Sequence, residues 1–204
     1  MKKTLLLGLT IVMLLIAGCV RSLYPLFTEK DYIFDKRLVG TWPDKSGDTW
    51  TFSKGSDKSY VLKYYQHEFG GGLFHQGTPG DTGIFVAHLG RLGKNLFFDV
   101  YPEHMNEGGR GEKVFGNVKN DFYNWHFIPM HSIMKVWFEH DSLRLSLLDN
   151  GWLKKMIDNK SVKISHERLD DQIILTASTE ELQQLVTKYA DDDKAFPNED
   201  RPPK

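Results

Sequence analysis

The sequence predicts a mainly β chain: an antiparallel sheet closed into a barrel, with a short late helix and a C-terminal helix. Three observations lead to this prediction. Aromatic residues make up 13% of the chain and glycines number 18, which is typical of strands joined by turns. Runs of alternating polar and apolar residues recur at hairpin spacing, about eight to nine times in all. An antiparallel sheet of that size has to hide its edge strands, and closure into a barrel does so.

The first strands are predicted as two hairpins. Polar and apolar residues alternate over 48–52, turn residues follow at 54–58, and Tyr60, Leu62 and Tyr64 continue the alternation. The second hairpin is expected to have strands at 84–89 and 96–101. Glycine-rich loops are expected at 70–83, between the two hairpins, and at 103–112, after the second.

The second half is predicted to hold four more strands and both helices. Met134, Val136 and Phe138 share one face of a strand whose hairpin partner covers 143–147. A short helix is expected at 150–158, and two brief strands at 162–165 and 173–176.

The C-terminal helix has the clearest local signal. Ser178 and Glu181 form a capping box at its start. Leu182, Leu185 and Val186 recur on one face, which favours a packing surface against the barrel over a partner site.

The first 19 residues have the architecture of a secretory signal. Lys2 and Lys3 form a positive start, residues 5–15 are apolar, and two small residues precede Cys19. The apolar run is short for a membrane span, and no stop-transfer pattern follows it. The alternatives are an ordinary signal peptide with a chance cysteine, or an uncleaved anchor helix.

The residues Leu15-Ile16-Ala17-Gly18-Cys19 resemble the lipobox of bacterial lipoproteins. The resemblance implies cleavage before Cys19, diacylation of its thiol with chains such as palmitate, and acylation of the new amino terminus. Cys19 is the one cysteine in the sequence, which excludes an internal disulfide. Each buried CH₂ contributes about 0.8 kcal/mol, so two or three chains hold a protein firmly at a membrane. In such lipoproteins of diderm bacteria, Asp after the cysteine favours inner-membrane retention, so Val20 implies the periplasmic face of the outer membrane.

These predictions divide the chain into four parts. They are a cleaved signal peptide (1–18), a lipidated tether (19–37), a barrel domain with its C-terminal helix (38–190) and a disordered acidic, proline-rich tail (191–204). Cleavage after residue 18 of 204 leaves 186 residues, enough for one domain with a sizeable core. Residues 22–27 are unusually apolar for a linker, so we expect them to dock on the domain.

Gly40-Thr41-Trp42 resembles the Gly-x-Trp signature at the entry of lipocalin barrels. In that family the Trp packs under the closed end of the barrel, and a C-terminal helix lies against the wall. The resemblance implies a lipocalin-like barrel with Gly40 and Trp42 as its fold signature. The lipobox followed by 22–27 and 39–42 also looks like a group of uncharacterised bacterial lipoproteins, which implies no known activity.

Charge and motifs exclude several classes of function. Losing Lys2 and Lys3 changes the formal net charge from −1 to −3, and such a near-balanced surface argues against nucleic acid as a partner. The chain has eight histidines but no HExxH motif and no cysteine cluster. His88 and Asp99 lie on facing strands, where the two side chains are able to pair. We therefore expect no enzyme, no metal and no cofactor; a hydrolase with the glycine-rich loops as a lid is the less favoured alternative.

Aromatic residues are the candidates for ligand binding. Those expected at the barrel interior or its mouth are Trp50, Phe52, Tyr60, Phe98, Trp125 and Phe138. A barrel of about eight strands has room for side chains or for one small ligand, so its interior is either open or filled. The predicted function is non-catalytic binding of a small hydrophobic or lipid-like molecule at the membrane. The alternative is a structural or assembly role with an envelope protein as partner, which an exposed apolar patch would favour.

Overall fold

Strands dominate the chain, so the predicted mainly β class is correct. The computed structural model describes residues 19–44, 46–69, 78–102, 126–139 and 142–197. The strands are β1 (Arg21–Ser22), β2 (Tyr32–Ile33), β3 (Gly40–Pro43), β4 (Thr49–Lys54), β5 (Ser59–Phe69), β6 (Thr78–Leu92), β7 (Asn95–Pro102), β8 (His131–Glu139), β9 (Ser142–Leu147), β10 (His166–Leu169) and β11 (Gln172–Leu175). The helices are the short 3₁₀ turns η1 (Glu29–Asp31) and η2 (Lys36–Leu38), then α2 (Asn150–Asp158) and α3 (Thr179–Tyr189).

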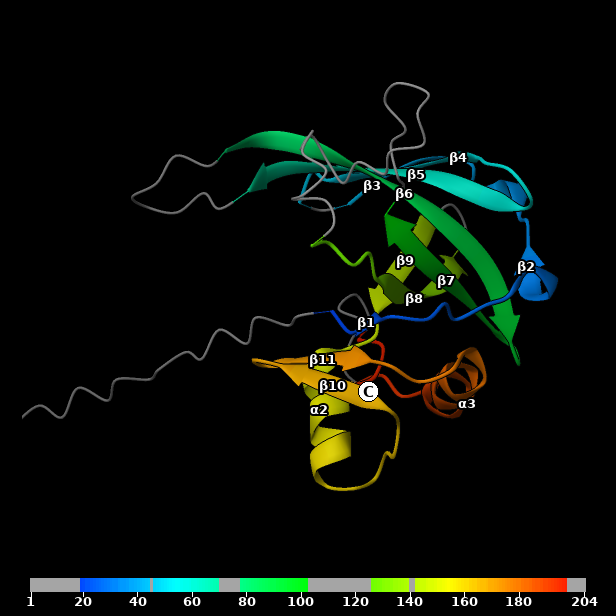
Figure 1. Cartoon of the computed structure of the whole chain (residues 1–204). Coiled ribbons are helices and arrows are strands. Elements are labelled where there is room, and N and C mark those ends of the chain that lie inside the picture. Colours follow the sequence, from blue (N-terminus) through cyan, green and yellow to red (C-terminus); the bar gives the residue numbers. More distant parts are fainter. Residues whose placement is uncertain (1–18, 45, 70–77, 103–125, 140–141, 198–204) are drawn as a thin grey trace, which may run out of the picture.

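All of these strands belong to one 11-stranded sheet. Its path runs β10-β11-β1-β8-β7-β6-β5-β4-β3, while β2 pairs with β6 and β9 pairs with β8 off this path. From β3 to β9 the strands pair antiparallel in chain order, as the alternation predicted. Figure 1 shows these strands curling above a lower layer of β10, β11, α2 and α3.

The predicted closed barrel is not confirmed, because the sheet is not closed. In the part of the chain that is described, no ladder joins β3 to β9. One edge of β8 is shared: residues 134–139 pair with β9, while His131 and Ser132 pair with β1 and lead the sheet into the lower layer. At the other end, β3 has four residues and finishes at Pro43, which has no N–H donor for a further ladder.

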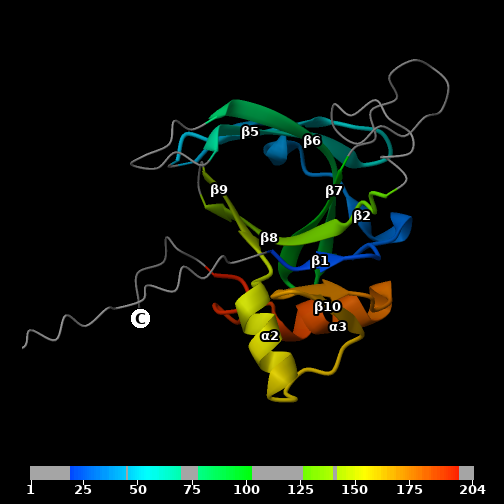
Figure 2. The same ribbon diagram turned by 60° about the vertical axis from the view of Figure 1, so that its left-hand side comes forward.

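Two apolar cores lie on opposite faces of the sheet, because successive strand residues point to opposite sides. On β7, Phe97 belongs to one core and Phe98 to the other; Ile133 and Met134 divide in the same way on β8. The helix-side core joins α2, α3 and β11 to the N-terminal segment. The inner core fills the concave face of β3 to β9, and Figure 2 shows the two helices on the far side of β8 and β1 from that face.

The N-terminal segment is built into the helix-side core, so residues 22–27 dock on the domain as expected. β1 pairs antiparallel with β8 and parallel with β11. Val20, Leu26 and Phe27 are buried there. Gly90 on β6 lies under the Phe27 ring, in a place where any Cβ would overlap that ring. The predicted tether therefore supplies core residues.

Both predicted helices are present. α2 occupies the predicted range, and the Asp149 carboxylate caps it by accepting the N–H of Trp152 at 2.6 Å. α3 opens with the predicted capping box of Ser178 and Glu181. Neither helix, nor any other in the described residues, is long and apolar enough to cross a bilayer.

The end of the chain packs before it leaves the described region. Ala195 and Phe196 are buried in the helix-side core, and the Ser146 hydroxyl donates to the Pro197 carbonyl at 2.8 Å. The predicted tail (191–204) thus begins inside the packed domain, and residues 198–204 lie outside the described residues.

Two local predictions are wrong. Part of the loop expected at 70–83 is strand: β6 begins at Thr78, and Gly83 pairs with Tyr64. Residues 162–165 form no strand, since Val162 donates its N–H to the Met156 carbonyl at the end of α2. The strand comes later, as β10. The apolar side chain of Val162 packs in the helix-side core and not on a strand face.

Candidate functional site

The candidate site is the concave face of β3 to β9, which carries the inner core and most of the predicted ligand residues. Three of these residues form its centre: Phe52, Tyr60 and Phe98 are at most 1% exposed. The Phe52 and Phe98 rings stack with centroids 5.2 Å apart, and Tyr60 meets Phe98 edge-on at 5.8 Å. The middle of this face is therefore filled by side chains, with geometries that aromatic pairs favour.

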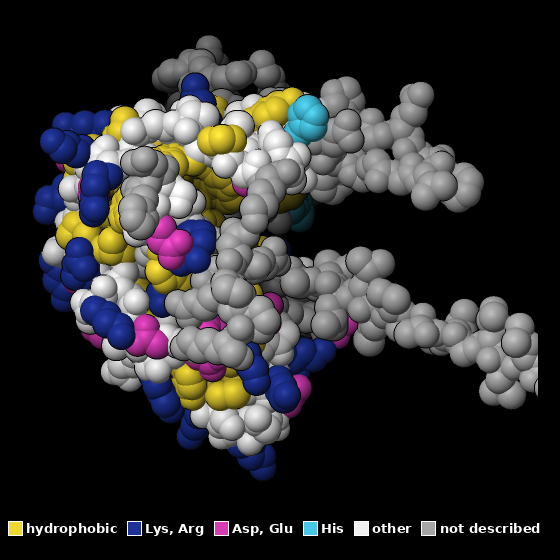
Figure 3. Space-filling view, turned by 180° about the vertical axis from the view of Figure 1, so that it is seen from behind, with side chains coloured by type: hydrophobic (Ala, Val, Ile, Leu, Met, Phe, Trp, Pro, Cys, Tyr) yellow, Lys and Arg dark blue, Asp and Glu magenta, His cyan; other side chains and the backbone are white. Residues whose placement is uncertain are grey.

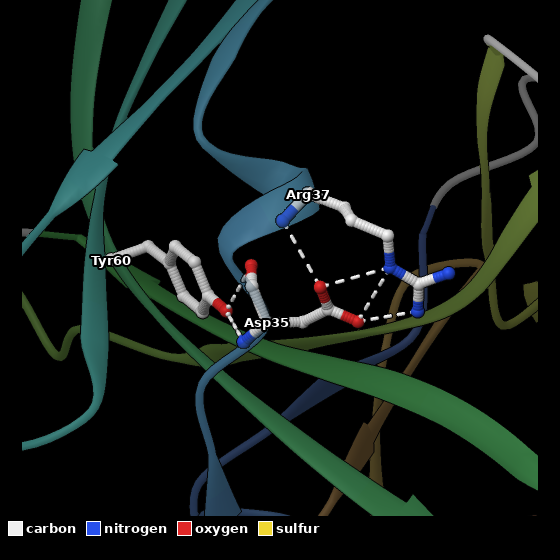
Figure 4. Close-up of polar contacts among 3 residues, drawn as sticks. All are labelled: Asp35, Arg37 and Tyr60. Atoms are coloured by element: carbon white, nitrogen blue, oxygen red, sulfur yellow. Dashed lines mark hydrogen bonds and ion pairs between the residues drawn. The ribbon is translucent and has the colours of Figure 1, made fainter.

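The hydroxyl of Tyr60 is satisfied by one backbone residue. Tyr60 accepts the N–H of Asp35 at 2.6 Å and donates to the Asp35 carbonyl at 3.1 Å (Figure 4). The Phe34 ring stacks on Tyr60 with centroids 5.0 Å apart. The segment before η2 therefore closes this end of the concave face.

Arg37 adds a charged group to the closed end. Its guanidinium pairs with the Asp35 carboxylate, with Nε 3.0 Å from each oxygen, and these hydrogen bonds hold the pKa of Asp35 below its usual range (Figure 4). The same guanidinium lies 4.3 Å from the centroid of the Phe138 ring, in cation–π geometry. Arg37 could not be predicted as part of this site, because no local pattern relates it to Phe138, on a strand about 100 residues later.

The other end of the concave face carries a row of half-buried aromatic rings. Trp42, Trp50 and Tyr64 are cross-strand neighbours on β3, β4 and β5, and the Trp50 and Tyr64 rings lie 4.4 Å apart. The Tyr64 hydroxyl donates to the Asp48 carboxylate at 2.5 Å; burial and this carboxylate raise the pKa of Tyr64. Figure 3 shows hydrophobic side chains lining a hollow among the upper strands.

The structure thus separates the predicted ligand residues. Phe138 lies at the closed end, Trp50 at the other end, and the three remaining described rings fill the middle. Trp125 lies outside the described residues. Trp42 and Tyr64 complete the row with Trp50, and the alternation through both strands was the signal that could have grouped them.

Gly40 and Trp42, the predicted lipocalin-like signature, both lie in β3, directly after η2. Gly40, the first residue of β3, has a φ of +147°, a conformation that favours glycine. The indole N–H of Trp42 donates to the Leu38 carbonyl at 2.9 Å, and its ring packs against the inner core. This pair fixes the segment that closes the face.

Cys19 is the first of the described residues. It forms an isolated bridge with Asp149, and burial raises the pKa of its thiol. A thiol with a raised pKa is a poor nucleophile at neutral pH. The geometry therefore gives no support to Cys19 as a catalytic thiolate.

The polar pair that the structure brings together differs from the expected one. His88 and Asp99 are cross-strand partners, but the Asp99 carboxylate bonds to Nδ1 of His131 at 2.6 Å. His88 instead stacks on Tyr32, with ring centroids 4.0 Å apart, and its burial lowers its pKa. Among the described residues, no three His, Cys, Asp or Glu side chains are grouped to hold a metal ion.

A second concavity lies on the opposite side of the sheet, beside the start of α3. It has a volume of about 450 Å³ and is lined by polar groups around the Tyr24 ring, among them Thr28, Lys30, Ser178, Glu180 and Gln183. The charges of Lys30, Asp31 and Glu180 make this groove less suited to an apolar ligand than the concave face.

No protein-family model, no curated protein and no solved structure matches this chain.

Proposed function

We propose that this chain is a lipoprotein of the cell envelope, anchored through acyl chains on Cys19, whose lipocalin-like curved sheet binds a small hydrophobic or lipid-like molecule. In a diderm host the anchor would lie in the outer membrane, on its periplasmic side. The proposal includes no catalytic step and no cofactor.

One observation supports the binding role above the others: Trp42, Trp50 and Tyr64 are only half-buried, although both Trp rings pack against the inner core and the Tyr64 ring lies against Trp50. Aromatic rings that remain partly exposed in a concave face offer apolar contact area to a ligand. Because Phe52, Tyr60 and Phe98 already fill the middle, the ligand would bind at the Trp50 end and not deep in the sheet.

Native mass spectrometry of the mature chain with Cys19→Ser, followed by lipid extraction, tests the binding role. An apolar molecule that co-purifies with this protein and is lost in Trp50→Ala supports the proposal. Tyr65→Ala is the matched control, because Tyr65 neighbours Tyr64 but points to the exposed face of β5. If Tyr65→Ala releases the molecule as readily as Trp50→Ala, or if no molecule is retained, the binding role is wrong.

A structural role with an envelope protein is the second candidate. Phe34 and Val39, on either side of η2, are 36% and 45% exposed, and exposed apolar residues of this kind suit a protein partner. Two results together would favour this candidate over ligand binding. The first is a protein mass with no bound molecule, and the second is a chemical cross-link to a partner protein that Val39→Asp abolishes.

A further inference from the structure

The protein body begins one residue after Cys19. Val20 is 1% exposed, and its N–H donates to the Leu148 carbonyl at 3.2 Å. Arg21 and Ser22 already belong to the sheet as β1. Acyl chains on Cys19 would therefore be attached without a flexible spacer, and the membrane that holds them would lie against the surface beside β1.

Exposed apolar side chains lie on the two segments that adjoin the far end of β1. They are Leu23 (39% exposed), Tyr24 (53%), Phe127 (44%) and Ile128 (70%). The first two directly follow β1, and the last two lead into β8, whose first residue, His131, pairs with Ser22. Both segments thus leave the β1–β8 ladder at the same end. From Cys19 to Tyr24, an extended chain covers at most about 17 Å.

We infer that this interfacial patch, made of Leu23, Tyr24, Phe127 and Ile128, lies in the headgroup region of the bilayer that carries the anchor. The inference rests on the proposed lipid attachment at Cys19. Tyrosine suits the headgroup level because its ring is amphipathic, and the aliphatic and Phe side chains gain by leaving water. The patch would fix the orientation of the domain on the membrane.

Apolar contact and not charge would drive this docking. The groove beside Tyr24 holds one lysine, Lys30, and two carboxylates, Asp31 and Glu180. This lining offers no cluster of positive charge that would attract anionic lipid. Vesicles of phosphatidylcholine, with or without phosphatidylglycerol, are therefore expected to accept the patch equally.

The test uses the full chain, purified with its acyl chains and reconstituted into phosphatidylcholine vesicles. Ile128→Cys is labelled with a nitrobenzoxadiazole fluorophore, which reports polarity. Leu169→Cys is the matched control, since Leu169 on β10 is 58% exposed but lies outside the patch. At position 128 we expect emission at shorter wavelength and loss of quenching by aqueous iodide. The label at position 169 is expected to stay fully quenched.

Flotation of the same vesicles tests the lipid anchor at Cys19 separately from insertion of the interfacial patch. If the protein floats and iodide quenches both positions equally, the patch does not enter the bilayer, although the anchor holds. If the protein does not float, the anchor fails and this inference fails with it. Shielding of position 128 that persists in concentrated protein without vesicles would identify a second copy of the chain as the occupant, and would overturn the inference.

Discussion

The carboxylate of Asp99 on β7 lies 2.6 Å from Nδ1 of His131 on β8, on the buried helix side of the sheet. Its second oxygen accepts the N–H of Leu26 at 2.7 Å. Asp99 is 2% exposed, so this one side chain joins two strands to the N-terminal segment in a place that water hardly reaches. Buried polar groups of this kind are costly to leave unpaired.

Replacing Asp99 with Asn is expected to lower the free energy of unfolding by about 2 kcal/mol, because the charged acceptor for His131 is lost. Urea denaturation checks this value. Asp57→Asn in the exposed β4–β5 turn is the control, since Asp57 has a φ of +45°, which Asn tolerates. Equal stability of the two variants would show that the Asp99–His131 pair contributes nothing.

The lowered pKa of the neighbouring His88 predicts that the stability of the protein depends on pH. Burial lowers its pKa in the folded protein below 6.5, more than the Asp99 carboxylate raises it. As the pH falls, the unfolded chain therefore binds the proton first, and stability decreases from about pH 7 downward through the folded pKa. Denaturation of the native chain and of His88→Gln across this range measures the effect. The stability difference between the two should change in favour of His88→Gln at low pH; a difference that stays constant would contradict the prediction.

Gly90 is expected to tolerate no side chain. The Cβ of Gly90→Ala would overlap the buried ring of Phe27, so we expect a loss of about 1–3 kcal/mol in the free energy of unfolding. Gly151→Ala on the exposed side of α2 is the matched control, and it should leave stability unchanged or slightly raised. Thermal unfolding of both variants measures their stabilities against the native chain. A Gly90→Ala protein as stable as Gly151→Ala would mean that Phe27 is free to move aside.

The last prediction concerns the proposed lipid attachment at Cys19. In cells fed an alkyne fatty acid, the native chain should carry the label, and Cys19→Ala should lose it and leave the membrane fraction. The fold should survive because the Cys19 side chain lies at the margin of the domain and the first fully packed residue is Val20. Circular dichroism of the variant checks the fold. A Cys19→Ala protein that still incorporates the label would exclude lipid attachment at this thiol.

Local signals explain the parts of the fold that were predicted well. The Ser178–Glu181 capping box and the helical spacing of 150–158 act within one or two turns, so they are readable without a partner. The hairpins were found because inner and outer residues alternate along β4, β5, β8 and β9. Gly80 and Gly83 have no side chain to alternate, so the start of β6 was predicted as a loop.

By itself, the sequence determined the mainly β class, the antiparallel hairpins, both helices and the aromatic character of the inner face. Only the tertiary structure decided that the sheet is not closed, that Phe52, Tyr60 and Phe98 fill its middle, and that Asp99 pairs with His131 rather than with His88. These features depend on which strand edges meet and on side chains brought together from distant positions. No short-range pattern records such contacts, because they form only when the whole chain has packed.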